Sequence, residues 1–202
     1  MTLYKKSTLR LPLQNAEVWY YPEVFSEEES GFYFRTLQHK VLWQQDEIRI
    51  FGKTHPQPRL TALYGDNLAP YSYSGITMHP HPFFPELAAI KETISTLCGH
   101  PFTSCLLNLY RNGRDSNGWH ADDEKELGIN PVIASVSFGE ERYFHFKYKK
   151  DKTLRYKLLL ENGSLLVMKG ATQHHWLHQI PKTTKDLEPR INLTFRNINI
   201  PT

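Results

Sequence analysis

Two histidines and one aspartate have the residue types and spacing of a metal site. His120-Ala121-Asp122 forms an H-x-D motif, and His178 follows far downstream. Two imidazoles and one carboxylate make up the facial triad that holds non-haem Fe(II) and leaves coordination positions open. Arg190 and Arg196 stand six positions apart near the C-terminus, and the guanidinium fork is suited to carboxylates. Together these residues predict an oxygenase that uses an acidic co-substrate.

The histidines at 174 and 178 allow a competing metal site. They would share one face of a helix, as in zinc proteases. However, no glutamate stands between them in the H-E-x-x-H position, and Gly170 and Pro181 on either side disfavour a helix. A closed structural zinc site would need four protein ligands, usually with thiolates, and the two cysteines lie outside the motif. The zinc alternative is therefore the weaker one and stays open.

The last expected strand separates its side chains by parity, because successive residues point to opposite faces. Ile191, Leu193 and Phe195 share one face. The polar residues on the other face are Arg190, Asn192, Thr194 and Arg196. A solvated outer face would look the same, but Asn108 and Tyr110 repeat the arrangement upstream, which favours a polar binding face. Six positions span about 20 Å, so the two arginines must lean together to bind a five-carbon dicarboxylate.

Strands dominate the second half of the expected fold. Ser26 followed by three glutamates predicts a helix over 26–38, and Pro85 and Gly99 bracket a second over 85–97. Short strands and turns are expected between 43 and 73. Beyond residue 102 we expect strands at 104–111, 132–138, 142–148, 153–160, 164–169, 175–180 and 190–198. This order favours a mainly β (α+β) fold, with a jelly-roll, or double-stranded β-helix, core and flanking N-terminal helices.

Size and composition fit one folded domain. The chain has 202 residues, 40% hydrophobic and 22% charged, and a net charge of +3. That charge is compatible with a nucleic-acid partner but does not argue for one. The two cysteines, Cys98 and Cys105, imply no disulfide framework. No long apolar run suggests a membrane helix, and the polar N-terminus lacks a signal-peptide core, so we expect a cytoplasmic protein.

These residues resemble the AlkB family of Fe(II)/2-oxoglutarate dioxygenases, especially its DNA-repair branch. The resemblance spans about half of the chain in the family's order. The segments that carry it are Asn108-Leu109-Tyr110, Trp119-His120-Ala121-Asp122-Asp123-Glu124, Gly163-Ser164-Leu165-Leu166-Val167-Met168, His175-Trp176-Leu177-His178 and Pro189-Arg190-Ile191-Asn192-Leu193-Thr194-Phe195-Arg196. It implies one dioxygenase domain over 1–202, with about 1–100 as an N-terminal extension and nucleotide-recognition lid and about 102–200 as the jelly-roll core.

The resemblance also implies roles for the site residues. His120, Asp122 and His178 would be the iron ligands and the catalytic centre. The distal carboxylate of the co-substrate 2-oxoglutarate would be held by Arg190, Tyr110 and Thr194. Its iron-chelating end would be held by Arg196 and Asn108, with Asn192 close by. O₂ would be the oxidant.

A substrate site is implied next to the metal and in the lid. Asp123 would contact the damaged base, with Glu124 as a supporting acid. The lid resemblance rests on Phe51 through Arg59, on Tyr64-Gly65-Asp66 and on Tyr71 through Gly75. Within it, Tyr71 and Tyr73 are candidate walls of the base pocket, Arg59 is a candidate contact, and Phe51 resembles an apolar tip that enters the duplex. Ordinary core packing is an equally good explanation for these three aromatic residues.

The implied reaction is oxidative demethylation of N-alkylated bases such as 1-methyladenine and 3-methylcytosine in single- or double-stranded DNA. One alternative keeps the chemistry and moves the substrate to RNA or to a small methylated molecule. Another is a catalytically inactive nucleic-acid-binding module. Intact ligand and clamp positions disfavour that module. Nothing in the sequence obliges a dimer, so we expect a monomer.

Overall fold

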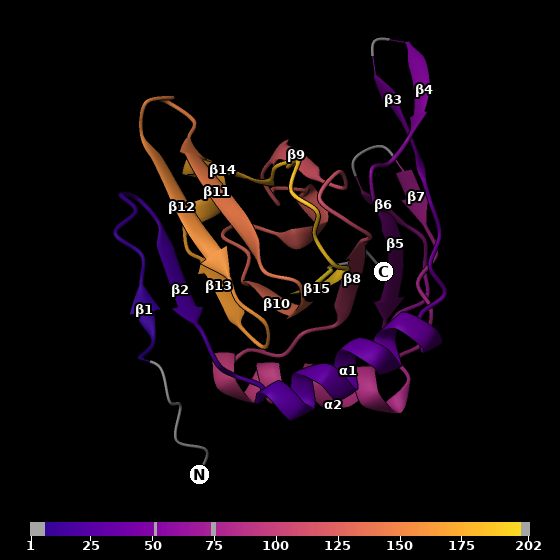
Figure 1. The fold of residues 1–202 in the computed structure, drawn as a ribbon. Helices are drawn as coiled ribbons and strands as arrows, with labels where there is room; N and C mark the ends of the chain where they lie inside the picture. Colours follow the sequence, from indigo (N-terminus) through magenta and orange to yellow (C-terminus); the bar gives the residue numbers. More distant parts are fainter. Residues whose placement is uncertain (1–6, 51, 74–75, 199–202) are drawn as a thin grey trace.

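The computed structural model describes residues 7–50, 52–73 and 76–198. Two antiparallel sheets face each other, and the two long helices cover the outer side of the larger sheet (Figure 1). The major sheet has the strand order β1-β2-β13-β10-β15-β8-β5, and the minor sheet has the order β12-β11-β14-β9. The mainly β fold predicted from the sequence, with a jelly-roll core and flanking helices, is confirmed.

The strands of the two sheets come from most of the chain. Those of the major sheet are β1 (Leu9–Arg10), β2 (Glu17–Tyr21), β5 (Leu60–Gly65), β8 (Ser104–Tyr110), β10 (Ile133–Gly139), β13 (Leu165–Lys169) and β15 (Arg190–Arg196). Those of the minor sheet are β9 (Asn117–His120), β11 (Arg142–Tyr148), β12 (Arg155–Leu160) and β14 (Trp176–Ile180). Three strands of the major sheet, β1, β2 and β5, thus come from the first hundred residues.

Both predicted helices are present. Helix α1 (Glu27–Lys40) starts with a capping box, in which Ser26 accepts from the Glu29 backbone and the Glu29 side chain accepts from Ser26. Helix α2 (Pro85–Cys98) has proline at its first position and ends at Gly99, whose φ of 59° is left-handed. Two shorter helices, the 3₁₀ helix η1 (Lys125–Leu127) and the one-turn α3 (Thr172–His175), lie within the second half of the chain.

The core has two main layers. One lies between the helices and the major sheet and includes Leu37, Ile90 and Phe195. The other lies between the two sheets and includes Phe146 and Trp176. Because β15 runs through the middle of the major sheet, its apolar face packs toward the helices and its polar face points between the sheets. All seven of its residues are buried. The polar face of this strand is therefore interior, not a solvated surface.

The structure corrects several boundaries. The strand expected from 153 begins at Arg155, because residues 151–153 form a turn in which Asp151 accepts from the Thr153 backbone. The strand expected from 175 begins at Trp176, because His175 closes α3. The helical zinc motif is excluded for the same reason: α3 ends before His178, which lies on a strand, and His174 is exposed.

Two small hairpins stand beside the open edge of the major sheet next to β5. They are β3 (Glu47–Ile50) with β4 (Lys53–Pro56), and β6 (Tyr71–Tyr73) with β7 (Ile76–Met78). The β3–β4 hairpin projects away from the body of the protein (Figure 1). No described helix is long and apolar enough to span a membrane.

Candidate metal centre

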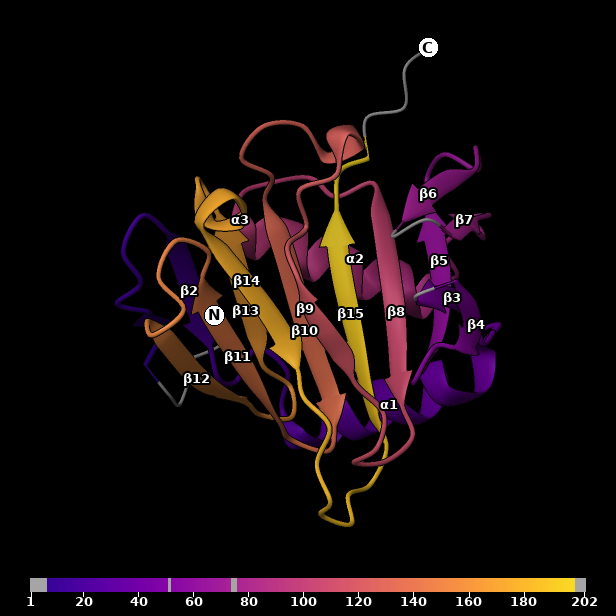
Figure 2. The same cartoon turned by 90° about the horizontal axis from the view of Figure 1, so that it is seen from above.

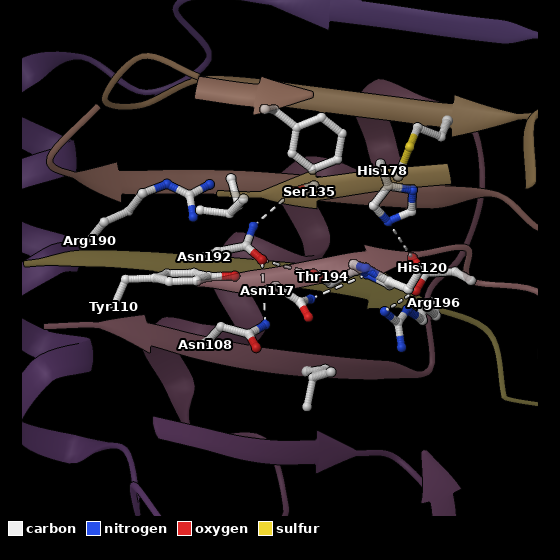
Figure 3. A pocket seen from close by; sticks show the side chains of 15 residues that line it. Asn108, Tyr110, Asn117, His120, Ser135, His178, Arg190, Asn192, Thr194 and Arg196 are labelled. Carbon is white, nitrogen blue, oxygen red and sulfur yellow. Dashed lines mark hydrogen bonds and ion pairs between the residues drawn. The ribbon is translucent and has the colours of Figure 1, made fainter. Parts of the chain in front are cut away.

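Pairing of two strands in the minor sheet brings the candidate metal ligands together. β14 runs antiparallel to β9, and His178 stands opposite His120 in their register. Asp122 follows two residues after His120, and its Oδ1 and Oδ2 atoms lie 4.0 Å from His120 Nε2 and His178 Nε2 respectively. One ligand atom from each residue lies within 4.8 Å of the others. Figure 3 shows both imidazoles at one end of a pocket between the sheets.

Each ligand is held by a second contact. His120 Nδ1 lies 2.7 Å from the Gly118 carbonyl, which fixes that nitrogen as the donor. Nε2 is then the lone-pair nitrogen that can bind a metal, and it lies 3.3 Å from Asn117 Nδ2. The His178 ring stacks on Phe144, with 5.1 Å between ring centroids. Arg196 Nη2 donates to Asp122 Oδ1 at 2.8 Å. The ligands therefore occupy fixed orientations before any metal binds.

Burial sets the charge state of the triad. It lowers the pKa of His178 to about 3 and also lowers the pKa of His120. Both imidazoles are thus neutral at pH 7, the form that binds metal ions. For Asp122, burial opposes ionisation, but Arg196 and the two histidines outweigh it and lower the pKa of the carboxyl. The site presents two neutral nitrogens and one carboxylate.

A pocket extends from the triad to a buried arginine. Its walls come from both sheets, and the residues are Leu106, Asn108, Tyr110, Asn117, His120, Asp122, Ser135, Phe144, Met168, His178, Ile180, Arg190, Asn192, Thr194 and Arg196. Arg190 lies at the end opposite the histidines (Figure 3). It is 1% exposed, and its Nη2 donates to Ser137 at 2.9 Å. Its Nε and Nη1 atoms are buried without a hydrogen-bond partner among the described residues, which suits a carboxylate ligand.

Amides and hydroxyls form the middle of the pocket. Asn192 Nδ2 donates to Ser135 at 2.7 Å, and Thr194 donates to Asn192 Oδ1 at 3.0 Å. Asn108 Nδ2 lies 3.5 Å from the same Asn192 oxygen. The polar residues of β8, β10 and β15 are therefore linked to one another across the sheet, and their side chains have few remaining conformations.

The family follows from comparison with known proteins. A family model described as the 2OG-Fe(II) oxygenase superfamily matches residues 17–196. The chain belongs to this superfamily. Within it, the chain belongs to the AlkB family: it is 43% identical over 196 residues to the human alpha-ketoglutarate-dependent dioxygenase alkB homolog 3, covering 93% of this chain and 68% of that protein.

Other AlkB proteins agree with this assignment. The human DNA oxidative demethylase ALKBH2 is 40% identical over 188 residues, covering 88% of this chain and 72% of that protein. The solved structure of OsALKBH1 superimposes with a TM-score of 0.66 at 16% identity, covering 89% of this chain and 97% of that chain, and supports the fold. The chain spans about two thirds of the length of human alkB homolog 3.

The AlkB assignment and the geometry agree on the cofactors. Members of the superfamily use Fe(II), 2-oxoglutarate and O₂, and this protein is such an enzyme. His120, Asp122 and His178 fit Fe(II) by donor type and spacing. The partnerless nitrogens of Arg190 fit a carboxylate of 2-oxoglutarate.

The structure places the expected 2-oxoglutarate residues around one pocket. Asn108, Tyr110, Arg190, Asn192, Thr194 and Arg196 all line it. The arginines differ from the expected clamp in one respect: Arg196 also holds Asp122, so it links the metal ligand to the pocket.

The expected substrate residues are dispersed. Arg59 is 5% exposed, and its Nε donates to Asn108 Oδ1 at 2.7 Å, so it supports the pocket wall. Asp123 follows the ligand Asp122, is exposed, and pairs with Lys149 at 3.1 Å. Glu124 is half-buried beside Asp122, and burial raises its pKa. Phe51 lies outside the described residues.

The backbone of Tyr71 and Tyr73 forms β6, and their side chains lie outside the described part of the structure.

Several supporting residues escaped the sequence analysis. Gln173 accepts from the Asp122 backbone, Ser137 from Arg190, and Phe144 stacks on His178. Their partners are 51, 53 and 34 positions away in the chain, so no local spacing signals them. The repeated polar parity of β10, where Ser135 and Ser137 alternate with buried Val136, is the one pattern that could have indicated the serines.

Proposed function

We propose that this protein removes N-linked methyl groups oxidatively from alkylated bases of the 1-methyladenine and 3-methylcytosine type in DNA. The observation that carries the proposal is the open His120, Asp122 and His178 triad at one end of a pocket closed by Arg190 at the other. Relatives at about 40% identity carry the name DNA oxidative demethylase, which supports DNA as the substrate.

The residue roles in this proposal follow the pocket. His120, Asp122 and His178 bind the iron. Arg190, Tyr110 and Thr194 bind the distal carboxylate of 2-oxoglutarate, and Arg196 and Asn108, with Asn192, face its other end. The guanidinium of Arg190 lies 5.3 Å from the centre of the Tyr110 ring, a distance that suits a cation–π contact. This contact keeps Arg190 aimed into the pocket.

The protein contributes position, charge and exclusion of water. With 2-oxoglutarate and O₂, bound iron supplies the oxidant that hydroxylates the N-methyl group, and the products are succinate, CO₂, formaldehyde and the unmodified base. His178 and Asp122 are 3% and 1% exposed, so bulk water is kept from these two ligands, while 22% of the His120 side chain is exposed. Arg196 holds the Asp122 carboxylate in its ionised form.

The base would enter at the exposed rim. Asp123 stands there, next to a metal ligand, and 1-methyladenine and 3-methylcytosine are cationic, so its carboxylate favours them electrostatically. Glu124 lies beside it as a supporting acid. Tyr71 and Tyr73 belong to a lid hairpin in this proposal, and Phe51 keeps the substrate role that the family resemblance implies. Arg59 acts through Asn108. Alkylation blocks base pairing, which lowers the cost of extruding the lesion.

We further propose one domain that works as a monomer in the cytoplasm. Two cysteines without a disulfide, one buried and one half-buried, are in keeping with a reducing compartment. RNA is the second candidate substrate, because the triad and the 2-oxoglutarate pocket determine the chemistry and not the sugar of the nucleic acid. A catalytically inactive binding module is disfavoured by the complete triad.

The test is release of formaldehyde and succinate by anaerobically iron-loaded protein after addition of 2-oxoglutarate and O₂. The substrates are 1-methyladenine oligonucleotides as single-stranded DNA, double-stranded DNA and RNA. We expect equal amounts of both products on DNA. Succinate without formaldehyde on all three oligonucleotides would reject 1-methyladenine in nucleic acid as the substrate. It would still support the iron and 2-oxoglutarate site. A His120→Ala protein that still released formaldehyde would reject the triad.

A further inference from the structure

Gln173 links the metal-binding loop to a different part of the chain. It lies on α3, between β13 and β14 (Figure 2), and is 1% exposed. Its side-chain oxygen accepts a hydrogen bond from the Asp122 backbone nitrogen at 3.0 Å. Its amide nitrogen lies 3.6 Å from the sulfur of Met168. The acceptor of this glutamine is therefore committed to the residue that supplies the carboxylate ligand.

Asp122 needs such a partner because it has left the sheet. β9 ends at His120, so none of the described strands pairs with the Asp122 backbone. The residue is nevertheless 1% exposed. A buried N–H group without an acceptor is strongly unfavourable. Gln173 supplies that acceptor, while Arg196 holds the carboxylate at the other end of the same residue.

Thr172, the first residue of the helix that carries Gln173, anchors this helix to neighbouring segments. Thr172 Oγ1 accepts from the Glu17 backbone at 3.0 Å and donates to the Lys169 carbonyl at 2.6 Å. α3 then runs directly into β14, which carries His178. One helical turn therefore fixes the backbone of one metal ligand and the start of the strand that carries another.

We propose that Gln173 is a positioning residue that sets the place of the Asp122 carboxylate relative to the two histidines, and so determines how tightly the site retains its metal. The inference rests on the metal site of the proposed function but not on the substrate. Outer contacts that hold a ligand in place commonly change metal affinity by about 10- to 100-fold when they are removed.

The experiment measures Co(II) binding by the full-length, metal-free protein, using competition with a chelator and the visible absorption of bound Co(II). Gln173→Leu removes the acceptor at similar volume. Gln173→Asn keeps the amide but withdraws its oxygen by about 1.5 Å, one carbon–carbon bond. We expect both to weaken Co(II) binding about 10- to 100-fold and to change the absorption spectrum. Gln173→Glu keeps an acceptor at full reach and should restore both.

Gln57 offers a matched control. It is also a buried glutamine, but its side-chain oxygen has no hydrogen-bond partner among the described residues. Gln57→Leu should leave Co(II) affinity and spectrum unchanged. Parent-like binding by Gln173→Asn, or equal weakening by Gln57→Leu, would overturn the positioning role. A parent protein that binds no Co(II) would overturn the metal site itself, and with it this inference, whereas binding without demethylation would reject only the substrate.

Discussion

Arg190 combines complete burial with unused hydrogen-bonding capacity. Its Nη2 donates to Ser137, while Nε and Nη1 have no partner among the described residues, and burial lowers its pKa to about 10. Arg190 stays charged at pH 7, so its Nε and Nη1 groups can bind an anion. Arg190→Ala should raise the KM for 2-oxoglutarate roughly 10- to 150-fold, since a charge-assisted hydrogen bond contributes about 1.5–3 kcal/mol.

The measurement is steady-state kinetics with varied 2-oxoglutarate, alongside DNA affinity measured without it. Arg190→Lys is the control that keeps the charge and loses the fork, and its KM should lie between those of the parent and the alanine variant. An equal loss of DNA affinity would show that the arginine does not act on the co-substrate alone.

His178 makes the metal-free protein sensitive to acid. Its pKa is about 3 in the folded state because of burial, against an ordinary value of 6.5. Between these values the unfolded chain binds the proton and the folded protein does not, so the free energy of unfolding falls as the pH falls from 6.5 toward 3. The loss is up to about 1.4 kcal/mol per pH unit. The lowered pKa of Asp122 acts only below its ordinary value of 3.8.

Urea unfolding of metal-free protein at pH 7, 6 and 5 measures this slope. His178→Gln removes the titrating group. The free energy of unfolding of that variant should therefore fall less steeply with falling pH, by up to about 1.4 kcal/mol per pH unit. The rest of the chain is common to both proteins, so the difference between the two slopes isolates the contribution of His178. Identical slopes would mean that His178 is not buried in its neutral form.

Spacing and parity predicted His120, Asp122 and the polar face of β15, because an H-x-D motif and an alternating strand are local patterns. His178 lies 56 positions beyond Asp122, and it was predicted from its residue type and from the resemblance of its segment to the AlkB family. The roles of Gln173 and Arg59 could not be predicted in this way. Both act through a partner about 50 positions away, Asp122 and Asn108 respectively. Arg59 was expected at the substrate because it lies in the lid segment, and only the three-dimensional fold places it behind the pocket.

At the scale of the elements, one buried arginine connects two loops through hydrogen bonds. Arg142, at the start of β11, is 4% exposed and donates to the carbonyls of Asn112, Asp115 and Pro181. It therefore ties the β8–β9 connection to the end of β14. Arg142→Met should lower the free energy of unfolding by about 2–3 kcal/mol, because buried carbonyls lose their donors.

Chemical unfolding of the variant and the parent measures this loss. Arg114→Met is the matched control, since Arg114 lies in the same loop and is exposed, and we expect it to change stability by less than about 0.5 kcal/mol. A loss as large in the control would mean that the loop itself, rather than the tether, is sensitive.

Strong periodicity explains which elements were predicted. The helices carried caps, and the long strands β8, β10, β11 and β15 carried clear alternation. β9 has four residues and contains Gly118, so its sequence shows no clear alternation. β2 has five residues, and the sequence analysis assigned it no strand although Asn15 and Pro22 flank it. The sequence predicts a strand from residue 175, where α3 ends, since a single helical turn has too few residues to show a period.

At the scale of the whole molecule, metal binding should raise thermal stability. Binding to the folded state alone adds about 2.7 kcal/mol when the free metal is at a hundred times its Kd. For a chain of 202 residues, this corresponds to a rise in Tm of roughly 5–10 °C. Thermal unfolding with Mn(II), followed by chelation with EDTA, measures the rise and its reversal.

Two variants test whether the metal that raises Tm binds at the triad. His120→Ala should abolish the rise in Tm. His174→Ala removes an exposed histidine outside the triad and should leave the rise intact. A rise that survived in the first variant would place the metal elsewhere on the protein.

The overall architecture was predictable because a run of short strands beyond residue 102 fits few folds. The assembly of the major sheet was not. β1, β2 and β5 enter it from the first hundred residues, and β1 and β2 pair beside β13, which lies more than 140 positions away. Such distant pairing leaves no mark in local sequence, since any strand with one apolar face could fill the same edge.

β9 occupies the edge of the minor sheet, where β14 is the one strand among the described residues that pairs with it. It is four residues long, yet it carries His120 and leads directly to Asp122. Edge strands fray more readily than central ones. Two of the three ligands thus lie on β9 or directly after it, and β9 is hydrogen-bonded along one side. A bound ion would link them to His178 on β14. Separation of β9 from β14 and release of the ion would then be a single event, so the lifetime of the loaded enzyme would depend on how often this four-residue edge strand opens.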